Sequence, residues 1–212
     1  MKVLLVDDHK MMRDGLRAVL EKQPDVEVVG EAANGREAIA LALSLRPTVV
    51  VMDITMPGLN GIDATRRLLK ELPSVKVIGL SMNTDRRYVM AMFEAGAVGY
   101  VVKSSASEEL FRAIVAASAG QTFVSPAVGE YVVRGALGDA APGAHKALSA
   151  REREVLQLLA EGKASKEIAA CLEIGLPTVE THRRQISLKL GLHSIAELTK
   201  YALREGLTTL DR

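Results

Sequence analysis

The stretch VVVMDITMPGLNG, residues 49–61, runs four apolar residues directly into a carboxylate and then into two turn-forming pairs. An uninterrupted apolar run that ends at Asp53 predicts a buried strand, because strands covered by helices on both faces are apolar throughout. The pairs Pro57–Gly58 and Asn60–Gly61 predict a sharp turn just beyond it. We therefore expect a parallel sheet with Asp53 at the carboxyl end of one strand.

Outward from this stretch, short β-branched runs such as KVLLVD and VKVIGLS alternate with amphipathic segments. Such alternation is typical of an α/β doubly wound, flavodoxin-like five-stranded parallel sheet. Its helices are expected at residues 11–22, 35–45, 60–71, 85–95 and 107–119.

Composition narrows the class of protein. The length of 212 residues favours two domains. A hydrophobic content of 48% and a net charge of +1 are those of a folded chain and exclude a disordered or strongly basic one. The first apolar run is too short for a signal-peptide core, and nothing approaches the roughly 20 apolar residues of a membrane span. We expect a cytoplasmic protein without a membrane partner. The single cysteine, Cys171, excludes an internal disulfide, and we expect a small buried residue there.

The second half of the chain changes character. Residues 1–119 form the expected α/β domain, and the Gly-, Ala- and Pro-rich part of residues 120–147 indicates a linker that could hold a short helix. Residues 148–212 show four helical segments and predict a small all-α domain. SARE at Ser149 and SIAE at Ser194 fit capping boxes. Tight turns are expected at three glycines, Gly162, Gly175 and Gly191.

The α/β half places polar side chains at the ends of four of its strands. Asp7 ends the first strand with Asp8 beside it, Asp53 ends the third, Ser81 the fourth and Lys103 the fifth. They should converge, because parallel strands meet ligands at their carboxyl edge. Clustered carboxylates repel one another unless a cation joins them, and hard oxygen donors favour Mg²⁺, or Mn²⁺. With a lysine to balance an anion, the set suits phosphoryl transfer to a carboxylate.

Each of these residues also has an ordinary structural interpretation. An Asp or Ser at a strand end often caps the next helix, and Lys103 could be a plain surface charge. Five matching residue types on the expected strand ends favour a shared site instead.

The all-α half holds an eight-residue helix, a short turn and a longer helix, the layout of a helix-turn-helix. One stripe of the longer helix is expected to pack inward: Val179, His182, Ile186 and Leu190. The opposite face carries Glu180, Thr181, Arg184 and Leu188, which suits reading of base edges. Residues around its rim suit phosphates: Lys166, Thr178, Arg183 and Lys189. An i,i+4 ion pair between Glu180 and Arg184 on a solvated face is the alternative.

Two resemblances carry these expectations further. VDDH, MDITMPGLNG, LSM and GYVVK resemble the receiver domain of bacterial two-component response regulators. LSAREREVLQLLAEGKASKEIA and TVETHRRQISLKLGL resemble the LuxR-type helix-turn-helix. Together they make nearly the whole chain similar to the NarL/FixJ family.

For the receiver half, the resemblance implies that Asp53 accepts a phosphoryl group from the phosphohistidine of a sensor histidine kinase. Asp8, Asp53 and the Thr55 carbonyl would bind Mg²⁺, with Asp7 acting through water. Ser81 and Tyr100 would form a coupled switch, and Lys103 would balance the phosphoryl charge. Catalysis would then be limited to self-catalysed phosphoryl acceptance and loss at Asp53.

For the helical half, the resemblance places Glu180, Thr181 and Arg184 at base-reading positions and gives the last helix a dimer contact. A homodimer formed on phosphorylation would bind an inverted repeat in promoter DNA. RNA polymerase is a candidate further partner. Family members often carry Ser or Thr where Ala164 and Gly175 stand, so the caps of two helices are in doubt.

Two alternatives stay open at this point. An enzyme of the haloacid dehalogenase type would use Asp53 as a nucleophile but needs a second Asp where Thr55 stands. An orphan regulator would use the α/β half only for dimerisation, although its acidic set would then be costly.

Overall fold

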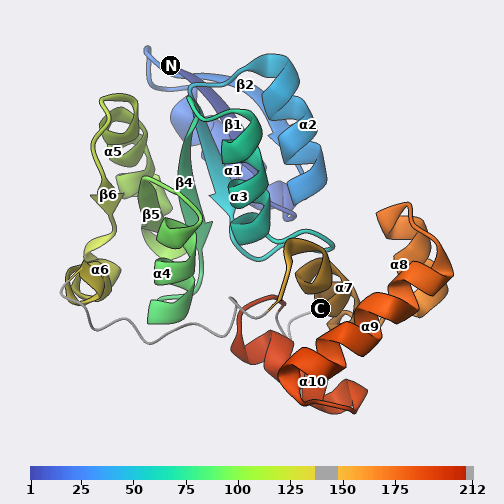
Figure 1. Ribbon diagram of the computed structural model, residues 1–212. Helices are drawn as coiled ribbons and strands as arrows, with labels where there is room; N and C mark the ends of the chain where they lie inside the picture. The colour runs from blue at the N-terminus through green and yellow to red at the C-terminus, as the bar shows by residue number, and fades with distance from the viewer. Residues whose placement is uncertain (137–147, 209–212) are drawn as a thin grey trace. The chain divides into compact units, whose positions relative to one another are not determined.

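The computed structural model describes residues 1–136 and 148–208, which fall into an N-terminal α/β unit and a C-terminal helical unit. The N-terminal unit is built on one parallel sheet with strand order β2-β1-β3-β4-β5-β6 (Figure 1). Its strands are β1 (Lys2–Val6), β2 (Glu27–Ala32), β3 (Val49–Asp53), β4 (Lys76–Ser81), β5 (Gly99–Val102) and β6 (Phe123–Val124). This confirms the doubly wound class.

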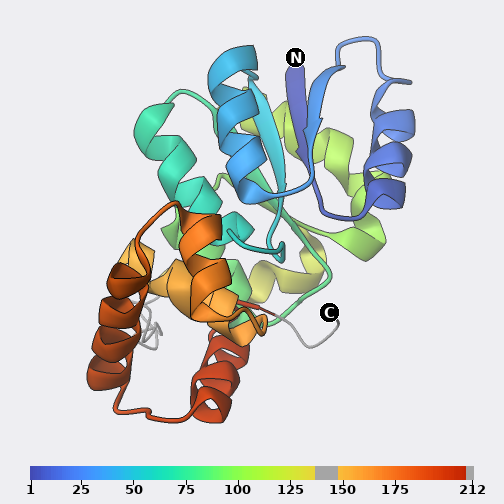
Figure 2. The same ribbon diagram turned by 90° about the vertical axis from the view of Figure 1, so that its right-hand side faces the viewer.

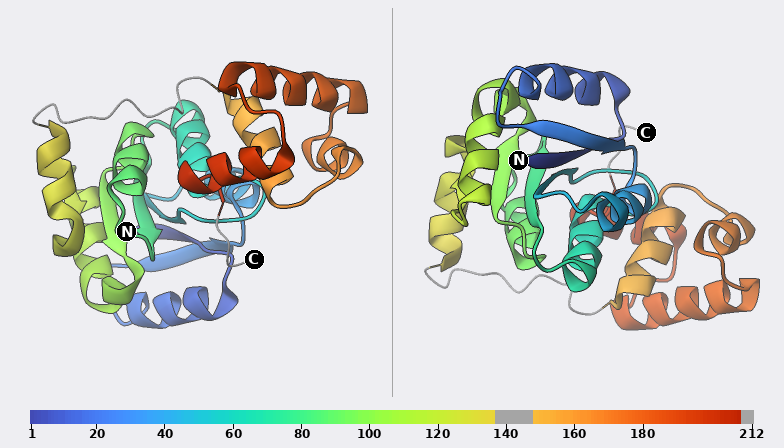
Figure 3. Two further views of the ribbon diagram at one scale, coloured as in Figure 1. Left: turned by 90° about the horizontal axis from the view of Figure 1, so that it is seen from below. Right: turned by 90° about the horizontal axis from the view of Figure 1, so that it is seen from above.

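Helices cover both faces of the sheet, as the end-on views show (Figure 3). They are α1 (Lys10–Leu20), α2 (Gly35–Leu45), α3 (Gly61–Glu71), α4 (Arg86–Glu94), α5 (Ala106–Ser118) and α6 (Gly129–Ala136). Apolar residues of α1 and α5 share one core with alternate residues of the strands, among them Val49 and Val51. All five residues of β3 are buried. Because helices cover both faces of the sheet, side chains on either face of this strand are buried, which explains why its residues before Asp53 are all apolar.

The expectation of five strands was wrong by one. Phe123 and Val124 pair in parallel with Gly99 and Tyr100 of β5. A strand of two residues shows no periodicity of its own, and its pairing depends on tertiary contacts that sequence patterns do not show. The predicted linker, residues 120–147, therefore begins with an ordered strand and includes helix α6, which packs beside α4. Its residues from 137 onward lie outside the described part of the chain.

The described part of the C-terminal unit, residues 148–208, contains four helices, drawn in orange to red in Figures 1 and 2. They are α7 (Ala150–Ala160), α8 (Ser165–Leu172), α9 (Leu176–Leu190) and α10 (Ile195–Arg204). Both predicted capping boxes are present, with Glu152 returning to Ser149 and Glu197 to Ser194. Val155, Ile186 and Tyr201 contribute to one apolar core shared by the unit.

The caps of α8 and α9 are simpler. Ala164 has no side chain that can cap α8, but its N–H donates to Glu167 Oε2 at 2.7 Å, so half of a capping box remains. Before α9 the left-handed residue is Glu173, at φ 53°, whereas Gly175 caps the helix at φ −66°. The expectation of a tight turn at Gly175 was therefore displaced by two residues.

Cys171 is exposed on α8, so the prediction of a buried residue was wrong; α8 is short and turns only part of its surface inward. Within residues 1–136 and 148–208, no helix has both the length and the apolar character needed to cross a bilayer.

Candidate functional site

The carboxyl edge of the sheet gathers the acidic residues that the sequence placed at strand ends. Asp7, Asp8, His9 and Asp53 each offer a ligand atom, and these atoms lie within 4.8 Å of one another. Asp7 and Asp53 are buried, with 0% and 2% of their surface exposed. Keeping two buried carboxylates ionised at this separation costs free energy unless positive charge compensates them.

Lys103 supplies part of that charge. Its Nζ lies 2.7 Å from Asp7 Oδ2 and 2.9 Å from Asp53 Oδ2. Burial nevertheless raises the pKa of Asp53 to about 6, with Lys103 opposing the rise and Asp7 adding to it. Burial works against the Lys103 ammonium, but Asp53 and Asp7 outweigh it and raise the pKa of the lysine. The negative charge of the site therefore exceeds the positive charge that Lys103 supplies.

This donor set fits a small divalent cation. Asp7, Asp8 and Asp53 present hard oxygens at one point, and the compensation they lack is what such an ion provides. The described residues could hold it through Asp8 and Asp53, with Asp7 beside them. His9 was not identified from the sequence, although it follows Asp8 directly. Its Nδ1 lies 3.0 Å from Asp8 Oδ1 and 3.3 Å from Asp7 Oδ1.

The loop after β3 holds the Asp53 carboxylate in place. The Thr55 N–H donates to Asp53 Oδ1 at 3.2 Å, so the chain turns back over the carboxylate. A side chain at Gly61 would place its Cβ 1.9 Å from the Asp53 carbonyl oxygen, which only glycine avoids. Asn60 begins α3 by accepting a hydrogen bond from the Asp63 N–H at 2.9 Å. The Asn60–Gly61 pair is thus required by close approach as well as by the turn.

Ser81 ends β4, and Tyr100 lies on the neighbouring strand β5, opposite Gly79. Ser81 is buried, and its Oγ accepts a hydrogen bond from the Asn83 N–H at 3.0 Å. The Tyr100 ring is fully buried, and its hydroxyl donates to the Asn83 carbonyl at 2.7 Å. Burial raises the pKa of the Tyr100 phenol, which stays protonated. Both switch candidates therefore hold the same loop residue.

The second helix of the helix-turn-helix, α9, presents the predicted polar face. Val179 and Ile186 are buried and His182 is half-buried, whereas Glu180, Thr181 and Arg184 are exposed. Lys166 and Thr178 are exposed as well. Leu188, 72% exposed, lies on the same outward side of α9. The helix thus offers a carboxylate, a hydroxyl and a guanidinium on its early turns.

Several of these side chains have partners within the unit. Glu180 pairs with Arg183, three residues on, rather than with Arg184, and the distance is 3.3 Å. Hydrogen bonding from Ser165, with help from Arg183, holds the pKa of Glu180 below its ordinary value. Thr181 Oγ1 donates to the Pro177 carbonyl at 2.9 Å.

Lys189 is also engaged: its Nζ lies 2.7 Å from Oε2 of Glu152, which is buried on α7. Arg183 Nη1 donates to Ser165 Oγ at 2.7 Å. Sequence spacing identified the helix face but not these pairings, because they depend on how α7 and α8 pack against α9.

Comparison with known proteins fits both units. Residues 3–115 match the response regulator receiver domain, and residues 146–202 match the LuxR family of bacterial regulatory proteins. The transcriptional regulatory protein LiaR of Bacillus subtilis (strain 168) is 43% identical over 209 residues, 97% of this chain and 98% of LiaR.

Two solved structures add detail. A structure of two RcsB dimers bound to two parallel DNAs is 29% identical with a TM-score of 0.60, covering 97% of this chain and 98% of that one. The isolated receiver domain of RcsB from Salmonella enterica serovar Typhimurium, with the phosphomimetic BeF3⁻, is 29% identical with a TM-score of 0.58. It covers 62% of this chain and 97% of that one. The chain therefore belongs to the NarL/FixJ family of two-component response regulators, with a receiver domain followed by a LuxR-type DNA-binding domain.

Proposed function

We propose that this response regulator is switched by phosphorylation of Asp53 and then binds promoter DNA as a dimer. A sensor histidine kinase is the donor: the N–P bond of its phosphohistidine breaks as an acyl phosphate forms on the Asp53 carboxylate. The single observation that carries the proposal is the bridge from Lys103 to Asp7 and Asp53 at the carboxyl edge. The bridge places the Lys103 ammonium beside the Asp53 carboxylate, where it can balance the charge of a transferred phosphoryl group.

A divalent ion, Mg²⁺ or Mn²⁺, would be held by Asp8, Asp53 and the Thr55 carbonyl, with Asp7 acting through water. It supplies charge neutralisation for the transferred group. The chain's own residues orient the acceptor: the Thr55 N–H fixes one Asp53 oxygen and Lys103 contacts the other. No further catalytic activity is proposed beyond phosphoryl acceptance and loss at Asp53. The haloacid dehalogenase alternative lacks support, since Thr55 stands where that chemistry needs a second Asp.

A phosphoryl group brings nearly two negative charges and three acceptor oxygens. Ser81, whose hydroxyl now accepts from the Asn83 N–H, gains a stronger partner in this anion. Because Tyr100 holds the carbonyl of the same Asn83, a shift of that loop changes the surroundings of both residues. The 82–85 segment is thus the part of the receiver that senses the phosphate.

In the helical domain, Glu180, Thr181 and Arg184 are proposed to read base edges, and Lys166, Thr178, Arg183 and Lys189 to contact phosphates. The two-fold symmetry of a dimer requires an inverted repeat. The RcsB dimers on DNA support this arrangement by analogy. Promoter binding in turn makes RNA polymerase a candidate partner, and the proposed place of action is the cytoplasm.

The test compares wild type with Asp53→Asn, each with and without beryllofluoride and Mg²⁺. Dimerisation is followed by analytical ultracentrifugation and DNA binding by footprinting on the protein's own promoter. Beryllofluoride should promote both in wild type and neither in the variant. Equal dimerisation and footprints in the two proteins would instead support an orphan regulator.

A further inference from the structure

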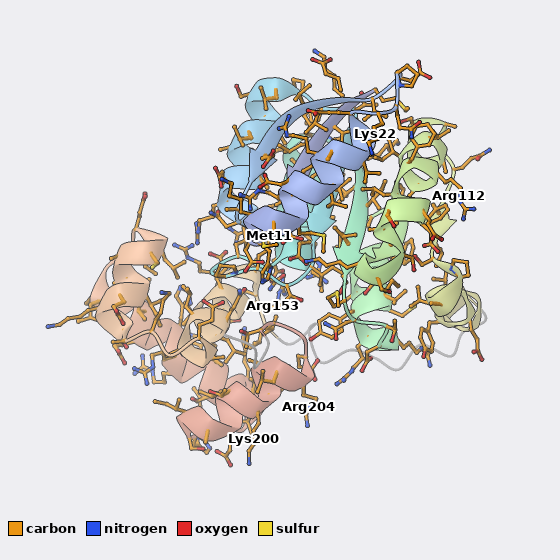
Figure 4. The ribbon with its side chains drawn as sticks, turned by 180° about the vertical axis from the view of Figure 1, so that it is seen from behind. Met11, Lys22, Arg112, Arg153, Lys200 and Arg204 are labelled. Carbon is orange, nitrogen blue, oxygen red and sulfur yellow. The ribbon has the colours of Figure 1, made fainter. Side chains whose placement is uncertain are left out.

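Arg13, on the first turns of α1, reaches from this helix to the backbone of the acidic pocket. Its Nη1 donates to the Asp7 carbonyl oxygen at 2.5 Å, and its Nε donates to Glu31 Oε2 at 3.1 Å. Only 13% of its side chain is exposed. Figure 4 shows α1 from outside, with Met11 marking the end of the helix that carries Arg13.

The Asp7 main chain is thereby held on both sides. Its N–H donates to the Ala32 carbonyl of β2 at 3.1 Å, which continues the ladder between β1 and β2 by one residue. Its carbonyl belongs to the peptide that joins Asp7 to Asp8, so the bond from Arg13 fixes the orientation of that peptide plane. The direction in which Asp8 leaves the strand depends on this plane.

Glu31 in turn holds Arg13. It is on β2, opposite Leu5 of β1 in the ladder, and it accepts from Arg13 on one oxygen and from Arg17 on the other, at 3.1 and 2.6 Å. The hydrogen bond from Arg17, followed by that from Arg13, lowers the pKa of Glu31, although partial burial opposes the effect. The carboxylate is therefore ionised at neutral pH and gives Arg13 a fixed anchor.

We propose that Arg13 is a positioning residue for the divalent-ion site, acting through the Asp7–Asp8 peptide and anchored by Glu31. This inference rests on the proposed function, because it presumes that Asp8 and Asp53 bind the ion. The guanidinium is suited to the task because its planar fork can donate to a carbonyl and a carboxylate at once. Partners of this kind outside the ligand set commonly affect metal affinity about 10- to 100-fold.

Arg17 provides a matched control. It also pairs with Glu31 and lies one helical turn further along α1, but among the described residues its guanidinium bonds to Glu31 and Glu21 and not to the pocket backbone. Arg17→Ala therefore removes a comparable ion pair while the bond to the Asp7 carbonyl stays in place.

The sign of the effect separates positioning from simple electrostatics. If Arg13 acted only through its charge, Arg13→Ala would strengthen Mg²⁺ binding, since a nearby positive charge repels the cation. If it positions Asp8, the same change weakens binding. Arg13→Lys keeps the charge but loses the fork, so it should recover only part of the affinity.

The experiment titrates the full chain with MgCl2 by isothermal calorimetry for wild type, Arg13→Ala, Arg13→Lys, Arg17→Ala and Glu31→Gln, with Asp8→Asn to identify heat from the site. Circular dichroism checks that each variant is folded. We expect Kd for Mg²⁺ to rise about 10-fold or more in Arg13→Ala, less in Arg13→Lys and Glu31→Gln, and to stay near wild type in Arg17→Ala.

Equal affinities in Arg13→Ala and Arg17→Ala, or tighter binding in Arg13→Ala, would overturn the inference while leaving the proposed function intact. If Arg13→Ala does not fold, the Kd values of Arg13→Lys and Glu31→Gln for Mg²⁺ are compared with that of Arg17→Ala, and equal or tighter binding overturns the inference. Absence of Mg²⁺ binding by wild type would overturn the proposed metal site, and the role of Arg13 with it.

Discussion

Lys103 Nζ lies between Asp7 Oδ2 and Asp53 Oδ2, at 2.7 and 2.9 Å, so a single ammonium joins the residue after β1 to the last residue of β3. All three side chains are at most 7% exposed. This one lysine does not balance the whole acidic cluster, so the site at the carboxyl edge of the sheet keeps excess negative charge.

Removing the lysine should expose the repulsion between the carboxylates. Without divalent ions, we expect Lys103→Ala to lower the free energy of unfolding of the receiver domain by roughly 3 kcal/mol, because it leaves buried charge uncompensated. Saturating Mg²⁺ should reduce this loss, since the ion takes over part of the compensation. The measurement is urea unfolding, with hydrogen exchange of β1 and β3 as the readout. A loss that is the same with and without Mg²⁺ would argue against a shared role.

The raised pKa of Asp53 predicts a stability that depends on pH. The folded carboxyl, with a pKa of about 6 against an ordinary 3.8, binds its proton more tightly than the unfolded chain does. The contribution of Asp53 to the stability of the metal-free protein therefore falls as pH rises from about 4 through about 6, and its penalty, up to about 3 kcal/mol, is complete above that range.

Asp53→Asn removes this penalty. We expect the variant to exceed wild type in unfolding free energy at pH 8 without Mg²⁺, and the difference to shrink as pH falls through 6 toward 4. Urea titrations of both proteins at several pH values, with hydrogen exchange of β3 as the readout, test this. A difference that does not vary with pH would show that burial does not perturb Asp53 as described.

Tyr100→Phe should loosen the loop that follows β4. The change removes the hydrogen bond from the hydroxyl to the Asn83 carbonyl at a cost of about 1 kcal/mol and leaves the ring in place. Hydrogen exchange in residues 82–85 should become faster, while phosphoryl uptake at Asp53 stays unchanged. Tyr88→Phe, on the neighbouring helix α4, is the control and should not affect the loop. Unchanged exchange in Tyr100→Phe would mean that the hydroxyl does not restrain this segment.

Much of the receiver fold was predictable because its signals are strong and local. The apolar run ending at Asp53, and its counterparts before Asp7 and Ser81, predicted strands whose ends the structure reproduces. Helix α2 spans residues 35–45 as expected, and helices α1, α3, α4 and α5 differ from their predicted bounds by at most two residues at either end. The convergence of Asp7, Asp8, Asp53 and Lys103 followed from strand polarity alone.

What the sequence did not reveal depends on tertiary packing. Strand β6 has two residues and forms only because β5 offers a free edge, so no periodicity indicated it. No sequence pattern singled out Arg13, because its bond to the Asp7 carbonyl depends on the position of α1 over β1 and β2. The engagement of Lys189 by Glu152 likewise needs α7 to lie against α9.

The residues of α9 that we propose to read bases should respond to truncation differently from those that we propose to contact phosphates. We expect Arg184→Ala to cost about 1 to 3 kcal/mol on the specific site and to relax base preference. Lys189→Ala should weaken binding to specific and random DNA alike. It should also lower domain stability, since it leaves the buried Glu152 carboxylate without its lysine.

Binding is measured by fluorescence anisotropy at two salt concentrations, and stability by urea unfolding. Lys189→Ala should reduce the salt dependence of binding. Equal loss of affinity on specific and random DNA for both variants would contradict the separate roles.

The central claim is that Asp53 takes up a phosphoryl group in a site completed by a divalent ion. The most direct measurement incubates the full chain with acetyl phosphate and maps the phosphorylated peptide by mass spectrometry, with its loss of phosphate in hydroxylamine identifying an acyl phosphate. With Mg²⁺ present, a single phosphoryl group should be found on the peptide that contains Asp53, and it should be absent with EDTA or in Asp53→Asn. Phosphate on another residue, or equal uptake without a divalent ion, would contradict the account.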